Sequence, residues 1–359
     1  MRHISQNGDR VTSAIVDGDW GGDDFQLAAV ALANGVNLLG ATATFGNVSL
    51  PRVSENAANI LRFLKADEVR LFEGAMAPSD RSEPLLGDGA HPVIKFLPEG
   101  RRDPKELQGA VEFILESLDR LPPQSVFITA SGPLTNIAQA LRQDPNTMKK
   151  VARVIIMGGC TTDIPATDIP FRRGNITPHA EFNFQQAALD AKTVMESDLP
   201  ITLLPMNCTH QLTLTPTRHR KIREAFRDNE LVRRALLGTD PVQNEEVRAH
   251  EAHPLDLGML NAPARLDMHK FGIDPVMHDV NCALYLLHPE QYDVVKGRIA
   301  VDVYDGEIKD DNVWGLTHGR IEFSGDESSH ISVAIGIKDP DALFQVVQDS
   351  LQALLPNRE

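Results

Sequence analysis

Short β-branched runs alternate with stretches of helical periodicity along most of the chain. The first pair is the run SAIVD at residues 13–17, followed by an apolar-periodic stretch that ends near Asn34 and Gly35. This alternation is typical of a mostly parallel sheet that is covered by helices on both faces. We therefore expect an α/β fold with an open, mostly parallel, Rossmann-like sheet flanked by helices.

The other expected elements continue this alternation as far as residue 207. Strands are expected at residues 37–44, 69–74, 125–131, 151–159 and 201–207. Helices are expected at residues 54–67, 105–121, 134–144 and 185–198. After residue 214 the pattern predicts charged helical stretches to about residue 250, helices at 279–287 and 339–355, and strands at 297–305 and 330–338. No repeat or linker interrupts the chain, so residues 1–359 are expected to form a single domain.

Composition limits the partners of the protein. Hydrophobic residues make up 42% of the 359 positions, enough for a sizeable core, and the formal net charge of -15 argues against nucleic acid and anionic membranes as partners. The three cysteines lie far apart and leave an odd one over, which favours a reducing compartment over a disulfide framework. The polar N-terminal segment, and the lack of an apolar run of ~20 residues, predict a cytoplasmic protein.

The segment VDGDWGGDD, residues 16–24, places four aspartates at the end of the first strand and the start of its helix. In open α/β sheets, ligands bind at the carboxyl ends of the strands. Four carboxylates this close repel one another unless they are solvated, protonated or neutralised by a cation. Calcium accepts ~6–8 oxygen ligands in irregular geometry, so we expect Ca²⁺ at this loop rather than Mg²⁺.

Other interpretations of this loop exist. Asp23 and Asp24 are suited to cap the following helix and to interact with its macrodipole. An EF-hand loop starting at Asp17 is excluded, because its fifth and twelfth positions are Gly21 and Ala28. A phosphatase with a nucleophilic aspartate also carries a DxD motif after its first strand, and on this segment alone it stays open.

Further motifs distinguish between these interpretations. FGNVSL follows the second strand, SGPLTNIA a middle strand and GNITPHAEFN the run VIIMGG, and MHDVNCALYLL comes late in the chain. With DGDWGGDD, in this order over about residues 13–340, they resemble the inosine-uridine type nucleoside hydrolases, and GLTHGR at residues 315–320 is similar to a late segment of that family. The resemblance implies a calcium-dependent ribonucleoside N-glycosidase that acts as a homodimer or homotetramer.

The resemblance also implies roles for individual residues. Calcium is expected to bind the carbonyl oxygen of Ser131 and three side chains, those of Asp19, Asp24 and Asp279. The ribose is expected to contact Asp23, Asn47, Met157, Asn175, Glu181 and Asn183. Two of these have structural alternatives, since a glutamate can open a helix and an asparagine after glycine can shape a turn. Asp17 is expected either to support the metal ligands or to have a purely structural role.

Two residues are expected to carry the chemistry. Calcium acidifies water less than zinc does, so an adjacent carboxylate, Asp19, is expected to take the proton of the attacking water. His278 matches a histidine that protonates the leaving base in one branch of the family, and its structural alternative is to cap the next helix. His210 is expected to be structural, and the other weak candidates to lie on the surface or in loops: His179, His250 and His253.

Three departures from the family pattern qualify the resemblance. Trp20 replaces a proline, and its indole could stack on a ligand, obstruct the crevice or, as the default expectation, pack beneath the loop. Residues 160–174 form a longer segment than is usual, and residues 85–97 replace a glycine-rich loop near the base. The base preference therefore stays open, and a non-catalytic nucleoside or ribose sensor is the rival function.

Overall fold

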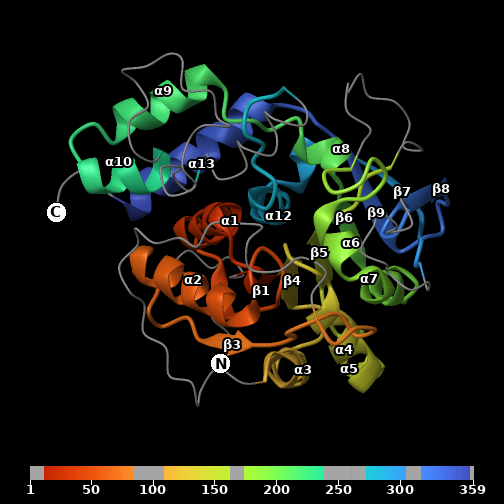
Figure 1. Ribbon diagram of the computed structural model, residues 1–359. Helices are drawn as coiled ribbons and strands as arrows, with labels where there is room; N and C mark the ends of the chain where they lie inside the picture. Colours follow the sequence, from red (N-terminus) through yellow and green to blue (C-terminus); the bar gives the residue numbers. More distant parts are fainter. Residues whose placement is uncertain are drawn as a thin grey trace.

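The computed structural model describes residues 12–83, 109–161, 174–237, 260, 272–304 and 317–355. Within these ranges, nine strands form one sheet in the order β3-β2-β1-β4-β5-β6-β9-β7-β8 (Figure 1). Their bounds are β1 (Ser13–Gly18), β2 (Asn37–Ala43), β3 (Leu71–Glu73), β4 (Val126–Ala130), β5 (Arg153–Met157), β6 (Ile201–Leu204), β7 (Tyr292–Val301), β8 (Ile321–Gly325) and β9 (Ile331–Ile337).

The sheet is mostly parallel, which confirms the fold expected from the sequence. The seven strands from β3 to β9 in the spatial order pair in parallel, and only β7 and β8 are antiparallel to their neighbours. From β1 the chain builds the sheet in both directions, through β2 and β3 on one side and through β4, β5 and β6 on the other. The junction of β1 and β4 is therefore a topological switch point, where open α/β sheets bind ligands.

Helices cover both faces of the sheet. Their bounds are α1 (Gly22–Ala33), α2 (Leu50–Phe63), α3 (Ala110–Arg120), α4 (Thr135–Gln143), α5 (Pro145–Met148), α6 (Phe182–Gln186), α7 (Ala188–Met195), α8 (Met206–Thr209), α9 (Pro216–Ala225), α10 (Glu230–Leu237), α12 (Val280–Leu287) and α13 (Pro340–Leu354). One core cluster joins α1, α2, α12 and α13 to the sheet, and a second joins α3, α4 and α7 to it. Strand β1 contributes Ala14 and Val16 to the first and Ile15 to the second, as the two-residue period of a strand requires.

Several element boundaries differ from the sequence expectations. The helix expected at residues 54–67 begins at Leu50, with Pro51 in its first turn, and ends at Phe63. The helix expected at 185–198 is divided at Ala187 into α6 and α7. Strand β8 was not expected, and β7 begins five residues earlier than the expected strand at 297, at Tyr292. In the part of the chain that the structure describes, no helix combines the length and the apolar character needed to cross a membrane.

Candidate active site

The aspartate loop joins β1 to α1 at the switch point. Asp17, near the end of β1, anchors the start of this loop. The Oδ1 atom of Asp17 accepts hydrogen bonds from Thr42 Oγ1 at 2.5 Å and from Asn136 Nδ2 at 2.7 Å. Burial raises the pKa of Asp17 to about 6, although these two hydrogen bonds act in the opposite direction. Asp17 therefore ties the loop to β2 and α4, as its structural alternative requires, and its support of the metal ligands stays a prediction.

Three carboxylates converge beside Asp17. Asp23, Asp24 and Asp279 each offer an oxygen atom, and these atoms lie within 4.8 Å of one another. Asp24 also accepts hydrogen bonds from Ser131 Oγ at 2.5 Å and from the backbone N–H of Gly21 at 2.7 Å, so it caps α1 as well. Burial, followed by the charge of Asp23, raises the pKa of Asp24 to about 7. Asp279 precedes α12. Burial, followed by the charges of Asp23 and Asp24, raises the pKa of Asp279 well above its ordinary value.

Asp19 lies beside this group, and Asn47 holds its carboxylate. Asp19 Oδ1 accepts a hydrogen bond from Asn47 Nδ2 at 2.8 Å, and Oδ2 accepts one from the backbone N–H of Asn47 at 2.7 Å. Burial, followed by the charges of Asp24 and Asp23, raises the pKa of Asp19 well above its ordinary value. A Cβ atom at position 46 would overlap the Asp19 carboxylate, so Gly46 permits this close approach.

Glu181 opens helix α6 and faces the end of β5. Its Oε1 atom accepts a hydrogen bond from the backbone N–H of Asn183 at 2.9 Å, and its Oε2 atom accepts from Gly159 at 2.9 Å and Phe184 at 3.2 Å. Burial raises the pKa of Glu181, while these hydrogen bonds and the nearby His278 act in the opposite direction. The helix-opening interpretation is therefore confirmed, and the same contacts fix the carboxylate at the carboxyl edge of the sheet.

Asn183 connects this segment to the strand ends at the switch point. Its Nδ2 atom donates to the carbonyl oxygens of Ser131 at 3.1 Å and Met157 at 3.2 Å. Asn175 lies close in sequence, and its Oδ1 atom accepts a hydrogen bond from the backbone N–H of Phe182 at 2.9 Å. The structure thus joins Asn183 to the ends of β4 and β5, whereas Asn175 contacts the start of α6.

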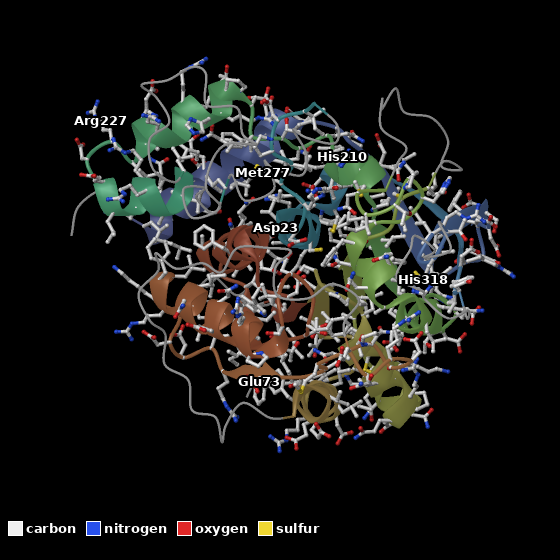
Figure 2. The ribbon with its side chains drawn as sticks, in the orientation of Figure 1. Asp23, Glu73, His210, Arg227, Met277 and His318 are labelled. Carbon is white, nitrogen blue, oxygen red and sulfur yellow. The ribbon has the colours of Figure 1, made fainter. Side chains whose placement is uncertain are left out.

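His278 lies next to Asp279 and contacts helix α8. Its Nδ1 atom is 2.8 Å from Thr209 Oγ1, and its ring is tilted against the ring of His210, with centroids 5.5 Å apart. Burial, with a smaller effect of His278, lowers the pKa of His210 to about 3, so His210 is neutral near pH 7. Figure 2 marks Asp23 near the centre of the molecule, with Met277 and His210 above it in that view.

Trp20 packs beneath the aspartate loop. Its side chain is fully buried in the core cluster that includes α1, and its Nε1 atom donates a hydrogen bond to the carbonyl oxygen of Thr42 at 3.0 Å. The backbone is left-handed at this residue, with φ of 45°. The default expectation for the indole is confirmed, and Trp20 neither stacks in the crevice nor obstructs it.

The remaining sequence candidates divide into described and undescribed residues. His179 is exposed, as expected. The following lie outside the described residues: His250, His253, the segment 85–97, and residues 162–173 of the longer segment 160–174. Thr209 and Asn136 had no role predicted from the sequence, although Asn136 lies in the motif SGPLTNIA and Thr209 directly precedes His210. Their side-chain contacts were not visible, because each joins residues more than 60 positions apart.

The donor set fits a hard divalent cation. Within the described ranges, no lysine or arginine forms an ion pair with Asp19, Asp23, Asp24 or Asp279, and three of these four carboxylates are buried. Buried carboxylates without a compensating charge are costly, as their raised pKa values indicate. All the candidate ligand atoms are oxygens, which is the chemistry that Ca²⁺ and Mg²⁺ prefer.

Sheet order and carboxylate cluster together define a class, the doubly wound α/β proteins with a candidate metal site at the switch point. Within that class, the model of the inosine-uridine preferring nucleoside hydrolase family matches residues 14–345, and the chain belongs to this family. It is accordingly an enzyme of the nucleoside hydrolase type.

Individual relatives agree with this assignment. An uncharacterized protein of Schizosaccharomyces pombe is 30% identical over 295 residues, which cover 80% of this chain and 84% of the relative. The pyrimidine-specific ribonucleoside hydrolase RihB of Escherichia coli is 26% identical over 302 residues, which cover 81% of this chain and 83% of RihB. The solved structure of a purine-preferring ribonucleoside hydrolase from Gardnerella vaginalis has a TM-score of 0.73 at 21% identity and covers 95% of this chain and 98% of its own, which shows the shared fold.

Proposed function

We propose that this nucleoside hydrolase cleaves the N-glycosidic bond of ribonucleosides to free base and ribose, with calcium held by Asp19, Asp24, Asp279 and the Ser131 carbonyl oxygen. The observation that carries the proposal is the convergence of the Asp23, Asp24 and Asp279 carboxylates at the switch point, with Asp19 beside them. When bound, the ion would supply positive charge that neutralises the carboxylates, and it would help to orient the sugar and acidify a nearby water.

Asp23 of this cluster and several side chains near it are proposed to bind the ribose. They are Asp23, Asn47, Met157, Asn175, Glu181 and Asn183. Cleavage of the bond builds positive charge on the sugar ring, which buried anionic groups stabilise without reorganising. Glu181 suits this role, because three backbone N–H groups already fix its carboxylate.

Proton transfer is proposed to use two residues. Asp19 takes a proton from the attacking water, and Asn47 holds the Asp19 carboxylate in one orientation through both of its oxygens. The proposed acid for the leaving base is His278, which directly precedes Asp279 in the chain and lies near Glu181. A positioned acid of this kind contributes about 10²–10⁴-fold to the rate.

Release of reducing sugar from uridine and inosine tests the function. We expect sugar to be released in the presence of calcium, chelation to stop the reaction, and Asp19→Ala to reduce kcat by at least about a hundredfold because no other group takes the proton. Circular dichroism spectra of the variant should match those of the wild type. Tight binding of intact ribonucleosides without sugar release would instead support the sensor.

Phosphate release from a nucleotide would support the aspartate-based phosphatase, which the family assignment does not favour. The single domain, the homodimer or homotetramer and the cytoplasmic location stay predictions. Base preference is best determined with a panel of ribonucleosides that begins with uridine, because the E. coli relative is described as pyrimidine-specific.

A further inference from the structure

The segment that carries His278 is locked to the segment that follows α8. Two backbone hydrogen bonds join residues 212–214 to residues 275–277, with nitrogen–oxygen distances of 2.7 Å and 2.9 Å. Thr213 and Val276 form an antiparallel bridge between them. The backbone therefore fixes the position of His278 relative to α8, although the two lie far apart in the sequence.

Helix α8 is in turn anchored to the sheet. The backbone N–H of Met206 donates to the carbonyl oxygen of Gly159, after β5, at 3.0 Å. The Gln211 side chain, just beyond α8, donates to the Ile335 carbonyl oxygen at 3.3 Å and accepts from the Ile337 N–H at 2.9 Å. The turn that contacts His278 is thus attached to β9 on one side and to the end of β5 on the other.

Both side-chain contacts of the His278 ring described above come from this turn. Thr209 Oγ1 is 2.8 Å from Nδ1, and the ring of His210 packs at 5.5 Å between centroids. Thr209 is fully buried, so water does not compete for this hydrogen bond from the surface. We propose that Thr209 is the positioning residue for His278, holding its imidazole in the orientation that delivers a proton to the leaving base.

The inference rests on the proposed function of His278 as the acid. Because Thr209 engages Nδ1, a proton given to the base must leave from Nε2. In the proposed hydrolysis step, the C1′–N bond breaks as a water oxygen bonds to C1′. One water proton passes to Asp19, the base nitrogen takes the electron pair of the broken bond, and that nitrogen receives the Nε2 proton of the His278 imidazolium, which becomes neutral imidazole. Solvent then returns a proton to His278 and removes one from Asp19.

Without the threonine hydroxyl, the imidazole loses this hydrogen bond and can rotate about its Cβ–Cγ bond. Thr209→Val removes the hydroxyl and keeps the shape, whereas Thr209→Ser keeps the hydroxyl. Thr213→Val is the matched control, because it makes the same change four residues away, where no side-chain hydrogen bond to His278 exists among the described contacts.

Two substrates separate positioning from general damage. Inosine or uridine, whichever the wild type hydrolyses faster, needs a proton on its leaving base, whereas p-nitrophenyl riboside releases a stable anion. We expect Thr209→Val to lower kcat on the nucleoside about ten- to hundredfold with little change in KM, and to change the p-nitrophenyl riboside rate less than about twofold. Thr209→Ser should retain most of the nucleoside activity, and Thr213→Val all of it.

A second readout does not depend on activity. In ¹⁵N spectra of histidine-labelled protein, assigned with His278→Ala, the His278 ring resonances should move in Thr209→Val and stay in place in Thr213→Val. Equal losses on both substrates, an unaffected nucleoside rate, or unchanged His278 resonances in Thr209→Val would overturn the positioning role. If the wild type releases no sugar from either kind of substrate, the proposed function fails and the positioning role fails with it.

Discussion

Burial determines the chemistry of individual residues in the aspartate loop. Asp17, Asp19 and Asp24 are all inaccessible to solvent or nearly so, and burial is the largest cause of the raised pKa of each. A buried carboxyl of this kind either keeps a proton or requires a compensating charge. The buried aspartates therefore make the loop costly to bury without a compensating charge. For the same reason they make the loop a strong candidate to hold a cation.

The contact between Gly46 and Asp19 gives a prediction at the scale of one residue. Gly46→Ala places a methyl group against the Asp19 carboxylate and forces Asp19 or Asn47 to move. We expect kcat to fall at least about a hundredfold, because displacements of about 1 Å have effects of that size. The rate of sugar release from uridine measures this fall in kcat.

Gly325→Ala is the control for this substitution, since a Cβ atom at that position meets nothing within 4 Å. Its kcat should equal that of the wild type. Wild-type turnover in Gly46→Ala would show that the Asp19 carboxylate does not need its present position.

At the scale of helices and loops, an ion pair between a buried aspartate and an exposed arginine joins the elements on one face of the sheet. Asp190 of α7 is fully buried and accepts hydrogen bonds from Arg142 Nη1 at 2.8 Å, Thr135 Oγ1 at 2.8 Å and the backbone N–H of Ser79 at 3.0 Å. It therefore connects α4, α7 and the loop after β3. Glu181 acts similarly at the start of α6, which is too short to be stable without such contacts.

Removing Arg142 tests the contribution of this network. Arg142→Ala leaves the buried Asp190 carboxylate without its cation, and we expect the free energy of unfolding to fall by about 2 kcal/mol, since Thr135 and Ser79 still donate to it. Urea denaturation measures the change. Lys149→Ala removes an ion pair whose side chains are both more than half exposed and should have a much smaller effect. An equally small effect of Arg142→Ala would mean that the network adds no stability.

For the whole molecule, the carboxylate cluster connects distant parts of the chain. Asp23 and Asp24 belong to α1, Ser131 follows β4, and Asp279 precedes α12 near the other end of the sequence. A cation bound there links all three segments, and binding to the folded state alone stabilises it. The site is therefore expected to influence global stability as well as activity.

The pH dependence of stability follows from the raised pKa values. Between about pH 4 and pH 7 the folded, metal-free protein keeps protons on Asp17 and Asp24 that the unfolded chain, with ordinary values of 3.8, has lost. Stability from these groups is therefore present at low pH and lost as pH rises through 6 and 7. We expect the Tm of the chelated protein to fall between pH 5 and pH 7.5, as measured by differential scanning calorimetry.

Calcium should reverse this trend, because it binds carboxylates only when they have lost their protons. At 100 times its Kd it adds about 2.7 kcal/mol to the stability, and the gain in Tm should be larger at pH 7.5 than at pH 5. Asp24→Asn should weaken both effects. A calcium effect that is the same at both pH values would mean that the ion does not bind at these carboxylates.

The sequence by itself determined the α/β class, the mostly parallel sheet and the position of the aspartate loop after the first strand, because periodicity and turn residues are local properties. Boundaries were less accurate where caps decide them, as at Leu50 and Ala187. The family resemblance also indicated the candidate site residues, and among them the structure brings the four carboxylates of Asp19, Asp23, Asp24 and Asp279 close together.

Only the tertiary structure decided which side chains meet. Three hydrogen bonds illustrate this: Trp20 to Thr42, Asn47 to Asp19, and Thr209 to His278. They join residues that are 22, 28 and 69 positions apart. Such contacts depend on how strands and helices pack, and no local pattern encodes them. The physical reason is that local periodicity sets which face of an element is buried, whereas side-chain partners depend on elements from elsewhere in the chain.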